Sequence, residues 1–365
     1  MGKNTEEIEN KNRAGVDSGI VRTSRFRQVS TSVLLLVLGT MAGLLLSEAV
    51  LRLLVDLDIL GMQTGYVRYI NRFHSDPVAE SVYRTSKDPL LKLEFIPNSR
   101  RHHIRINSHG FRGMEYSRDV PKGVTRIALL GDSEVFGSLL EEQDTLAGCL
   151  EKALTEKSDG GRFQVLNFGF PGYNTAQELR WMEKSVLQFN PDMVALYYVL
   201  NDPLPDSQAA LVRSSPWLRS YVFVLIKYLY FLTTIPETQV LHEEGDLVNF
   251  YQRLYHSEAA RDSLRLIHRM GTFLEKKKVP FFLVISPEII GFSDFNRYPY
   301  LSIHELLRSL QTPAIRVIDP LPALIELRTA PRDLWITPWD CHKGLKANRS
   351  IAQPVAERII TVLGH

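Results

Sequence analysis

A serine follows a short apolar run in the middle of the chain, where its hydroxyl could act as a nucleophile. The run RIALLG at residues 126–131 is followed by Asp132 and Ser133. A serine between a strand and a helix lies at the edge of a sheet, and its backbone N–H joins a helix N-terminus that favours developing negative charge. Gly-Asp-Ser is also a common turn and N-cap sequence, so the motif alone predicts only a turn.

An aspartate and a histidine, Asp340 and His342, stand two residues apart near the C-terminus, in WDCHKG. In an extended segment the side chains of residues i and i+2 point to the same side. The carboxylate can then orient the imidazole and stabilise its cationic form, as a histidine acting as general base requires. A single Asp-x-His pair is also typical of surface loops.

Two further turns offer hydrogen-bond donors. In NFGFPGYNT, residues 167–175, Gly172 can bring its N–H close to a substrate oxygen because glycine has no side chain. Asn201 follows another apolar run, and its side-chain amide can donate into the same space. Each pattern alone fits a routine connection or an Asx-turn equally well. We expect the neighbouring Asp132 and Asp202 to brace these loops rather than to react.

Short apolar runs alternate with helical stretches from residue 126 to the C-terminus. The predicted strands are 126–131, 163–169, 192–200, 280–286 and 315–319, and the predicted helices are 141–154, 175–189, 260–278 and 350–363. This alternation predicts an α/β fold, a doubly wound, mostly parallel five-stranded sheet with right-handed crossovers. The working site of such a sheet lies at the carboxyl ends of its strands, which is where Ser133, Gly172 and Asn201 fall.

The order of these motifs resembles that of the SGNH/GDSL hydrolase family, which is defined by four blocks carrying Ser, Gly, Asn and His in this order. The matching residues are Ser133 in GDSEVFG, Gly172 in NFGFPGY, Asn201 in VLND, and His342 with Asp340 in DCH. The resemblance covers residues 105–360 and includes the lead-in NSHGFRG, often seen in membrane-anchored members. It implies the flavodoxin-like three-layer sandwich of that family.

The last block departs from the family pattern. Many members have the aspartate three residues before the histidine, whereas here Trp339 stands there and Asp340 follows it. Many also have an asparagine two residues after the histidine and a glycine five after, where this chain has Gly344 and Ala347. These departures bear on the catalytic acid more than on the base.

The resemblance implies acyl-ester chemistry that needs no metal and no organic cofactor. Ser133 would attack an ester carbonyl, His342 would pass the proton to the leaving alcohol, and Asp340 would hold the histidine tautomer. The N–H groups of Ser133 and Gly172, with the Asn201 side chain, would form the oxyanion hole. Activity would rise through one ionisation near neutral pH. The implied substrate is an O-acyl, for instance O-acetyl, group on an envelope or extracellular glycan.

Two other functions fit the same sequence. The triad could transfer the acyl group to a sugar hydroxyl, because hydrolysis and transfer differ only in the acceptor that reaches the acyl-enzyme. Alternatively, the chain is a non-catalytic glycan-binding or scaffold subunit of an export assembly that retains the fold. Only the departures after His342 support that second alternative.

An apolar segment at residues 31–55 follows a polar tail at residues 1–30 and is just long enough to span a membrane. Arg22, Arg25 and Arg27 precede it, so the positive-inside rule places the N-terminus in the cytoplasm. The remainder would lie in the periplasm or outside the cell, held by a single-pass inner-membrane anchor. A cleaved signal peptide and a buried core helix are the alternatives.

The sequence divides the rest of the chain into a lead-in segment at residues 56–120 and a hydrolase domain at residues 121–365. A helical insertion at about 203–256 contains an apolar, aromatic stretch at 217–235. A second membrane span there would separate two strands of one sheet. We therefore expect either a cap helix over the site or an interfacial helix beside the anchor.

Composition excludes several classes of protein. With 44% hydrophobic and 23% charged residues and a formal charge of +2, the chain is not disordered, and a nucleic-acid partner is not expected. Cys149 and Cys341 cannot form a zinc site alone, and we predict two thiols rather than a disulfide. His102, His103 and His109 lack carboxylate or cysteine neighbours, so a strand or loop is expected there rather than a metal site.

Overall fold

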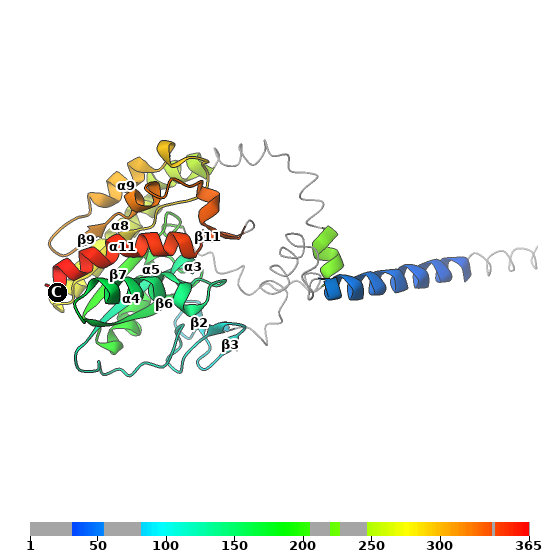
Figure 1. Cartoon of the computed structure of the whole chain (residues 1–365), viewed down its shortest axis with the longest axis horizontal. Coiled ribbons are helices and arrows are strands. Elements are labelled where there is room, and N and C mark those ends of the chain that lie inside the picture. The colour runs from blue at the N-terminus through cyan, green and yellow to red at the C-terminus, as the bar shows by residue number, and fades with distance from the viewer. Residues whose placement is uncertain (1–30, 55–81, 205–219, 227–246, 338–339, 365) are drawn as a thin grey trace, which may run out of the picture. The chain divides into compact units, whose positions relative to one another are not determined.

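The computed structural model describes residues 31–54, 82–204, 220–226, 247–337 and 340–364 (Figure 1). They belong to two compact units. The larger unit contains the predicted sheet, and the smaller unit contains the N-terminal apolar helix together with residues 220–226.

Five parallel strands form the central sheet of the larger unit. They are β5 (Val124–Gly131), β6 (Arg162–Gly169), β7 (Met193–Tyr198), β8 (Phe281–Ile285) and β9 (Arg316–Ile318). Their order is β6-β5-β7-β8-β9, and all four neighbouring pairs are parallel. The predicted α/β fold is confirmed, because each strand lies on a predicted apolar run. The connection after β5 leads to β6 on one side of it, whereas the connection after β7 leads to β8 on the other side. The strand order therefore reverses between β5 and β7.

Two helical layers bury both faces of this sheet. Helix α4 (Leu146–Lys157) packs against α11 (Leu345–Leu363), and α5 (Thr175–Lys184) packs against α8 (Glu258–Lys276) (Figure 1). Every residue of β7 and β8 is buried. This double coverage explains why both strands read as continuous apolar runs rather than as alternating patterns.

The helix boundaries differ from the predicted ones where a cap or a tighter turn intervenes. The predicted helix 141–154 begins as a 3-10 turn, η2 (Glu142–Asp144), and α4 starts only after Thr145, whose hydroxyl caps it. The predicted helix 175–189 changes to a 3-10 turn at η3 (Val186–Phe189). Several short elements carried no clear sequence signal: α3 (Ser133–Phe136), η6 (Phe295–Arg297), α9 (Leu301–Arg308), α10 (Leu321–Ile325) and η7 (Pro331–Leu334).

The described part of the lead-in, residues 82–120, belongs to the larger unit rather than forming a linker. It contains two small antiparallel hairpins, β1 (Tyr83–Thr85) with β2 (Leu93–Phe95), and β3 (Arg100–Arg101) with β4 (Ile104–Arg105). Phe95 is buried, and its ring centroid lies 5.1 Å from that of Phe136 and 4.4 Å from that of Phe170. The lead-in therefore contributes to the same hydrophobic core as the sheet.

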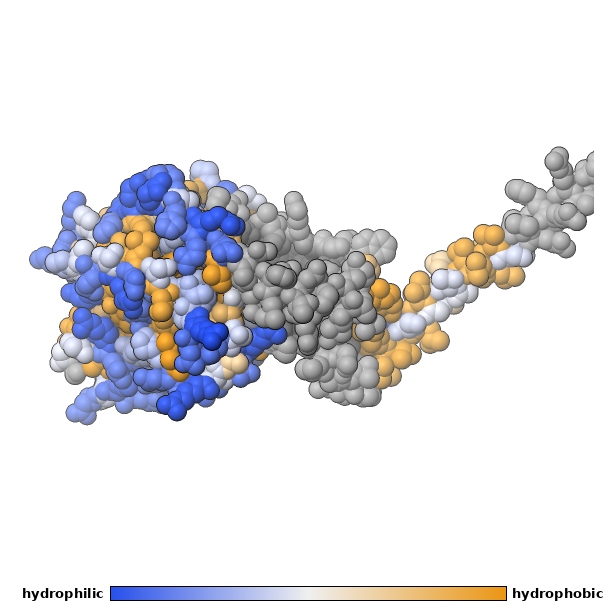
Figure 2. Space-filling model, turned by 90° about the horizontal axis from the view of Figure 1, so that it is seen from above, coloured by the Kyte–Doolittle hydropathy of each residue, from blue (hydrophilic) through white to orange (hydrophobic). Residues whose placement is uncertain are grey.

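Among the described residues, one helix, Thr31–Leu54 in the smaller unit, is long and apolar enough to cross a membrane. Its side chains are almost all exposed, and Figure 2 shows the apolar surface that results. At 1.5 Å per residue its 24 residues span about 36 Å, which exceeds the ~30 Å of a bilayer core. Length and composition suit a signal sequence equally well.

Residues 220–226 of the insertion contact the C-terminal part of this helix. Glu48 accepts hydrogen bonds from the Ser220 hydroxyl and from the N–H groups of Tyr221 and Val222, at 2.9–3.0 Å. Leu51 and Val224 are buried against each other. These contacts agree with the interfacial interpretation of the insertion, whose remaining residues in the 217–235 stretch lie outside the described residues.

Candidate active site

The turn after β5 presents Ser133 at the carboxyl edge of the sheet. Asp132 caps the single-turn helix α3, since its carboxylate accepts the Glu134 N–H at 2.9 Å. Gly131, at φ +159°, has no room for a side chain, because a Cβ would lie 2.5 Å from Val135 Cγ2. A Cβ on Gly169 would likewise collide with the Phe136 backbone. The two glycines thus let α3 sit tightly on the strand ends, with Ser133 as its first residue.

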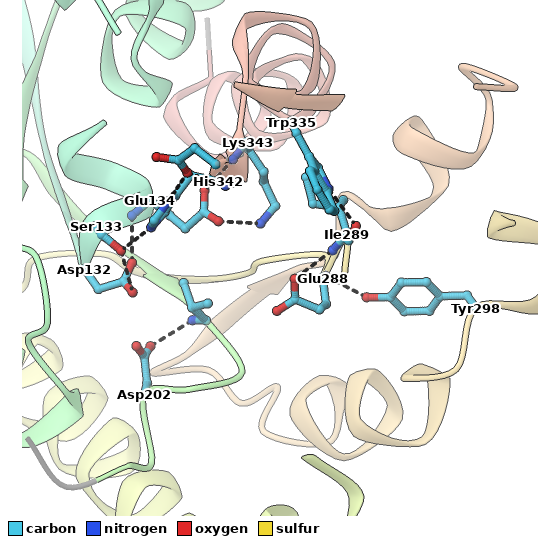
Figure 3. Close-up of polar contacts among 12 residues, drawn as sticks. Asp132, Ser133, Glu134, Asp202, Glu288, Ile289, Tyr298, Trp335, His342 and Lys343 are labelled. Carbon is cyan, nitrogen blue, oxygen red and sulfur yellow. Dashed lines mark hydrogen bonds and ion pairs between the residues drawn. The ribbon is translucent and has the colours of Figure 1, made fainter. Parts of the chain in front are cut away.

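Ser133, His342 and Asp340 are joined by a continuous chain of hydrogen bonds. The distance from Ser133 Oγ to His342 Nε2 is 2.8 Å, and that from His342 Nδ1 to Asp340 Oδ1 is 2.5 Å (Figure 3). An ionised carboxylate can only accept, so in the neutral imidazole Nδ1 carries the proton and Nε2 is left to accept the serine proton. The candidate nucleophile Ser133 therefore contacts the candidate base His342, which lies 209 positions away in the sequence.

The two-residue spacing of Asp340 and His342 is explained by the extended conformation of a strand that pairs with its neighbour. Strand β10 (Trp335–Thr337) pairs with β11 (Asp340–Lys343), so alternate residues of β11 share a side. Asp340 Oδ1 also accepts the backbone N–H of His342 at 3.0 Å. A Cβ at Gly344 would lie 2.9 Å from the Trp335 carbonyl oxygen, which explains why this chain has no asparagine there.

The electrostatic surroundings of His342 favour its protonated form. Burial lowers its pKa, but the imidazole remains 40% exposed. The hydrogen bond to Asp340 and the charges of Glu134, Asp340 and Asp132 outweigh burial and raise the pKa of His342 to about 9. The ionisation expected near neutral pH therefore moves to alkaline pH in the free protein. Burial also raises the pKa of Asp132.

Gly172 and Asn201 lie in the turns that follow β6 and β7, the two strands on either side of β5. Gly172 has φ +77°, a conformation that favours glycine. The three turns are tied together: Phe170 N–H donates to the Gly131 carbonyl at 2.9 Å, and Thr175 N–H donates to the Asp202 carbonyl at 3.4 Å. All three predicted donor positions thus occupy one edge of the sheet.

Asp202 braces the turn that carries Asn201. Its Oδ2 accepts the Val199 N–H at 2.8 Å (Figure 3). Asn201 Oδ1 is buried and accepts no hydrogen bond from the described residues. The turn is therefore held through its backbone.

Arg112, from the lead-in, braces the nucleophile turn from the opposite end, and sequence reasoning did not identify it. It is 1% exposed, and its guanidinium donates to the carbonyls of Phe136, Gly137 and Leu140 at 2.5–2.6 Å. Burial lowers its pKa to about 10. The one available signal was its position in the lead-in motif NSHGFRG.

Glu134 and Lys343 were also not identified from the sequence as functional residues. Each directly follows a member of the hydrogen-bonded chain, and Lys343 Nζ lies 3.2 Å from Glu134 Oε1. Both cysteines are free thiols, and among the described residues no group of three or more His, Cys, Asp or Glu is arranged to hold a metal ion.

No family model matches the chain, and no curated protein matches it. Solved structures do match, at low identity. A two-domain esterase active on acetylated mannans is 16% identical with a TM-score of 0.38, over 66% of this chain and 50% of that one. An acetyl xylan esterase is 15% identical with a TM-score of 0.38, over 64% and 100%. A G-D-S-L family lipolytic protein from Desulfitobacterium hafniense is 12% identical with a TM-score of 0.35, over 64% and 98%.

This chain spans half the length of the two-domain esterase. At such identities and TM-scores the likeness carries no argument about the fold or the substrate of this chain. The strand order, the three blocks that follow β5, β6 and β7, and the fourth block on β11 are properties of this structure itself. The chain has an α/β fold with a five-stranded parallel sheet, and the order of its four blocks resembles that of SGNH hydrolases.

Proposed function

We propose that this protein is a serine esterase that hydrolyses O-acyl esters, with Ser133, His342 and Asp340 as its catalytic triad. The observation that carries the proposal is the unbroken hydrogen-bond chain from Ser133 Oγ through His342 to Asp340, at 2.8 and 2.5 Å. A nucleophile in contact with a base, and a base oriented by a third group, is the arrangement that activates a serine hydroxyl.

In the first half of the reaction, Ser133 Oγ forms a bond to the ester carbonyl carbon while His342 Nε2 takes the serine proton. Asp340 stabilises the imidazolium that results. The tetrahedral intermediate then collapses, the bond to the leaving alcohol breaks, and His342 returns the proton to the alcohol oxygen. The product of this half is an acyl group on Ser133.

The negative charge on the intermediate requires donors at the same sheet edge. The backbone N–H groups of Ser133 and Gly172 and the side-chain amide of Asn201 are the proposed oxyanion hole. The adjacency of their three strands supports this assignment. Each donor of this kind is worth ~3 kcal/mol in the transition state.

In the second half, a water molecule activated by His342 attacks the acyl-enzyme and releases the acid. A sugar hydroxyl in place of water would make the protein an acyltransferase, with no change to the triad. Hydrolysis is the simpler proposal because it requires no second binding site. The product analysis below separates the two outcomes.

The proposed substrate is an O-acylated, for instance O-acetylated, glycan of the cell envelope. The Thr31–Leu54 helix and the arginines before it support a single-pass inner-membrane anchor with the catalytic unit in the periplasm or outside. Glycans are the acylated polymers that an anchored enzyme meets there. A free glycan-binding or scaffold role does not require Ser133 and His342 to be in contact.

The proposal is tested with the full-length protein in detergent. The wild type is expected to hydrolyse an aryl acetate and to be labelled by a fluorophosphonate at Ser133. Ser133→Ala should lose labelling and lower kcat/KM by at least about a thousandfold, with an unchanged circular dichroism spectrum and Tm.

The matched control is Ser138→Ala, a serine that follows the same turn but lies outside the hydrogen-bond chain, which should retain activity. A Ser133→Ala variant that kept more than a few per cent of wild-type activity would contradict the nucleophile assignment. Absence of both labelling and hydrolysis in the wild type would leave the scaffold role. Acetylated sugar as the only acetyl-containing product in the presence of a sugar acceptor would indicate transfer.

A further inference from the structure

A buried ion pair connects the two residues that directly follow the nucleophile and the base. Lys343 is 2% exposed, and its Nζ lies 3.2 Å from Glu134 Oε1. The backbone N–H of Lys343 donates to the other oxygen of the same carboxylate, at 3.1 Å. Figure 3 shows the Glu134 carboxylate beside His342 and directed toward Lys343.

Placing an ammonium group in this interior is costly unless the charge is well paired. Burial lowers the pKa of Lys343, but the nearby carboxylates of Glu134 and Glu288 more than offset it, so its pKa is raised. Its Nζ also lies 5.9 Å from the centre of the Tyr197 ring. Lys343 is therefore charged. An apolar residue of similar length would fill the same space but would not supply this charge.

The ion pair joins the same two elements as the catalytic contact does. Glu134 belongs to α3 and Lys343 to β11, and these are the elements that carry Ser133 and His342. Two links therefore run side by side between α3 and β11, one through Ser133 and His342 and one through Glu134 and Lys343. Because Glu134 accepts from both the side chain and the backbone of Lys343, the second link constrains β11 in position and in rotation.

The pair also determines the charge next to the base. Asp340 faces His342 from its own strand, Glu134 faces it from α3, and Asp132 faces it from the turn before α3. Lys343 is the cation among these groups that contacts Glu134, and Glu288 lies on the far side of Lys343 in Figure 3. Removing either member of the pair changes the field at His342, and the two removals act in opposite directions.

We infer that Glu134 and Lys343 are positioning residues for ester hydrolysis, which hold α3 and β11 at the distance needed by Ser133 and His342 and balance the charge beside the base. This inference rests on the proposed esterase function. It gives a role to the lysine that follows His342.

The test is the pH dependence of kcat/KM for aryl acetate hydrolysis by the full-length wild type, Glu134→Gln and Lys343→Met. Glutamine keeps the size and an acceptor oxygen but removes the negative charge, so the acid limb should move to lower pH by about half a unit or more. Methionine keeps the length but leaves the Glu134 charge uncompensated, so the limb should move to higher pH. For both variants kcat should fall about tenfold or more while KM changes little, because the loss is in geometry at the reacting atoms.

The double variant Glu134→Gln/Lys343→Met should regain part of the activity lost in Lys343→Met, since no buried charge is then unpaired. The control is Lys157→Met, which removes the exposed Lys157–Glu357 ion pair of 2.7 Å and should leave the profile unchanged. If Lys343→Met does not fold, the profile of the isosteric Glu134→Gln variant still decides. An active wild type whose acid limb superimposes on that of Glu134→Gln would overturn the inference, and an inactive wild type would overturn the esterase proposal and this inference with it.

Discussion

At the scale of single residues, Asp340 serves two donors with one oxygen. Its Oδ1 accepts the backbone N–H of His342 at 3.0 Å and contacts His342 Nδ1 at 2.5 Å. One carboxylate therefore fixes both the strand conformation and the ring orientation. A two-residue spacing therefore suffices for this contact, because residues 340–342 are extended.

Asp340→Asn should therefore lower kcat by orders of magnitude with a smaller change in KM. An amide cannot stabilise the imidazolium, and it can favour the wrong histidine tautomer. The general base is active when neutral, so kcat/KM is lost as the pH falls below the pKa of His342, which is about 9 in the free protein. Because Asp340 contributes to that rise, the acid limb of the variant should move to lower pH.

His342→Ala provides the reference for this measurement, since it removes the base and should be at least as damaging. If Asp340→Asn cost less than about tenfold and left the pH profile in place, the histidine would work with the serine as a dyad. Asp340 would then only organise the hairpin.

At the scale of elements, the nucleophile turn is held at both ends by residues from different parts of the chain. Asp132 caps the start of α3, and Arg112 from the lead-in satisfies three carbonyls at and after its end. A four-residue helix has no intrahelical partner for most of its carbonyl groups. The lead-in is thus required for the geometry of the site, although it contributes no reacting group.

Arg112→Met should lower the free energy of unfolding by about 2–4 kcal/mol, because it leaves three buried carbonyls without their donor. Urea unfolding of the full-length protein measures this change, and kcat should fall in conditions where the variant is still folded. Arg105→Met is the matched control, because that arginine side chain is 52% exposed and 4.0 Å from its nearest carboxylate. Equal stability losses in the two variants would show that Arg112 does not brace the turn.

At the scale of the whole molecule, the insertion between β7 and α8 contacts the N-terminal helix through Glu48. The glutamate also pairs with Arg52 at 2.7 Å, and the Arg52 guanidinium lies 4.6 Å from the centre of the Tyr221 ring. Glu48 and Arg52 lie in the last two turns of the Thr31–Leu54 helix. Charged and aromatic residues are tolerated at the ends of membrane-spanning helices.

The proposed topology predicts that alkaline phosphatase fused after residue 365 is active in cells, because export carries the fusion across the membrane. The same reporter fused after residue 30 should be inactive, as this position precedes the helix. A strictly cytoplasmic reporter after residue 365 would disprove both the orientation and the envelope substrate. A shortened, soluble exported product would identify the helix as a cleaved signal sequence.

The sequence by itself determined the sheet and the positions of its functional turns. Strands such as β7 and β8 are buried on both faces, so their apolar runs are continuous and visible without any partner. Ser133, Gly172 and Asn201 follow such runs directly, and in a parallel sheet the ends of neighbouring strands share an edge. The ends of the helices were harder to predict from the sequence, because caps such as Thr145 and 3-10 turns depend on local hydrogen bonds.

Only the tertiary structure decided how the site is held together. The β10–β11 hairpin brings Asp340 into register with His342, and Arg112 reaches α3 from 24 or more residues away. Glu134 and Lys343 are 209 positions apart. They directly follow Ser133 and His342, but no sequence pattern singles them out. Apolar periodicity reports burial, which is a local property of the chain. Which buried charge pairs with which depends on contacts between distant segments, and these leave no periodic trace in the sequence.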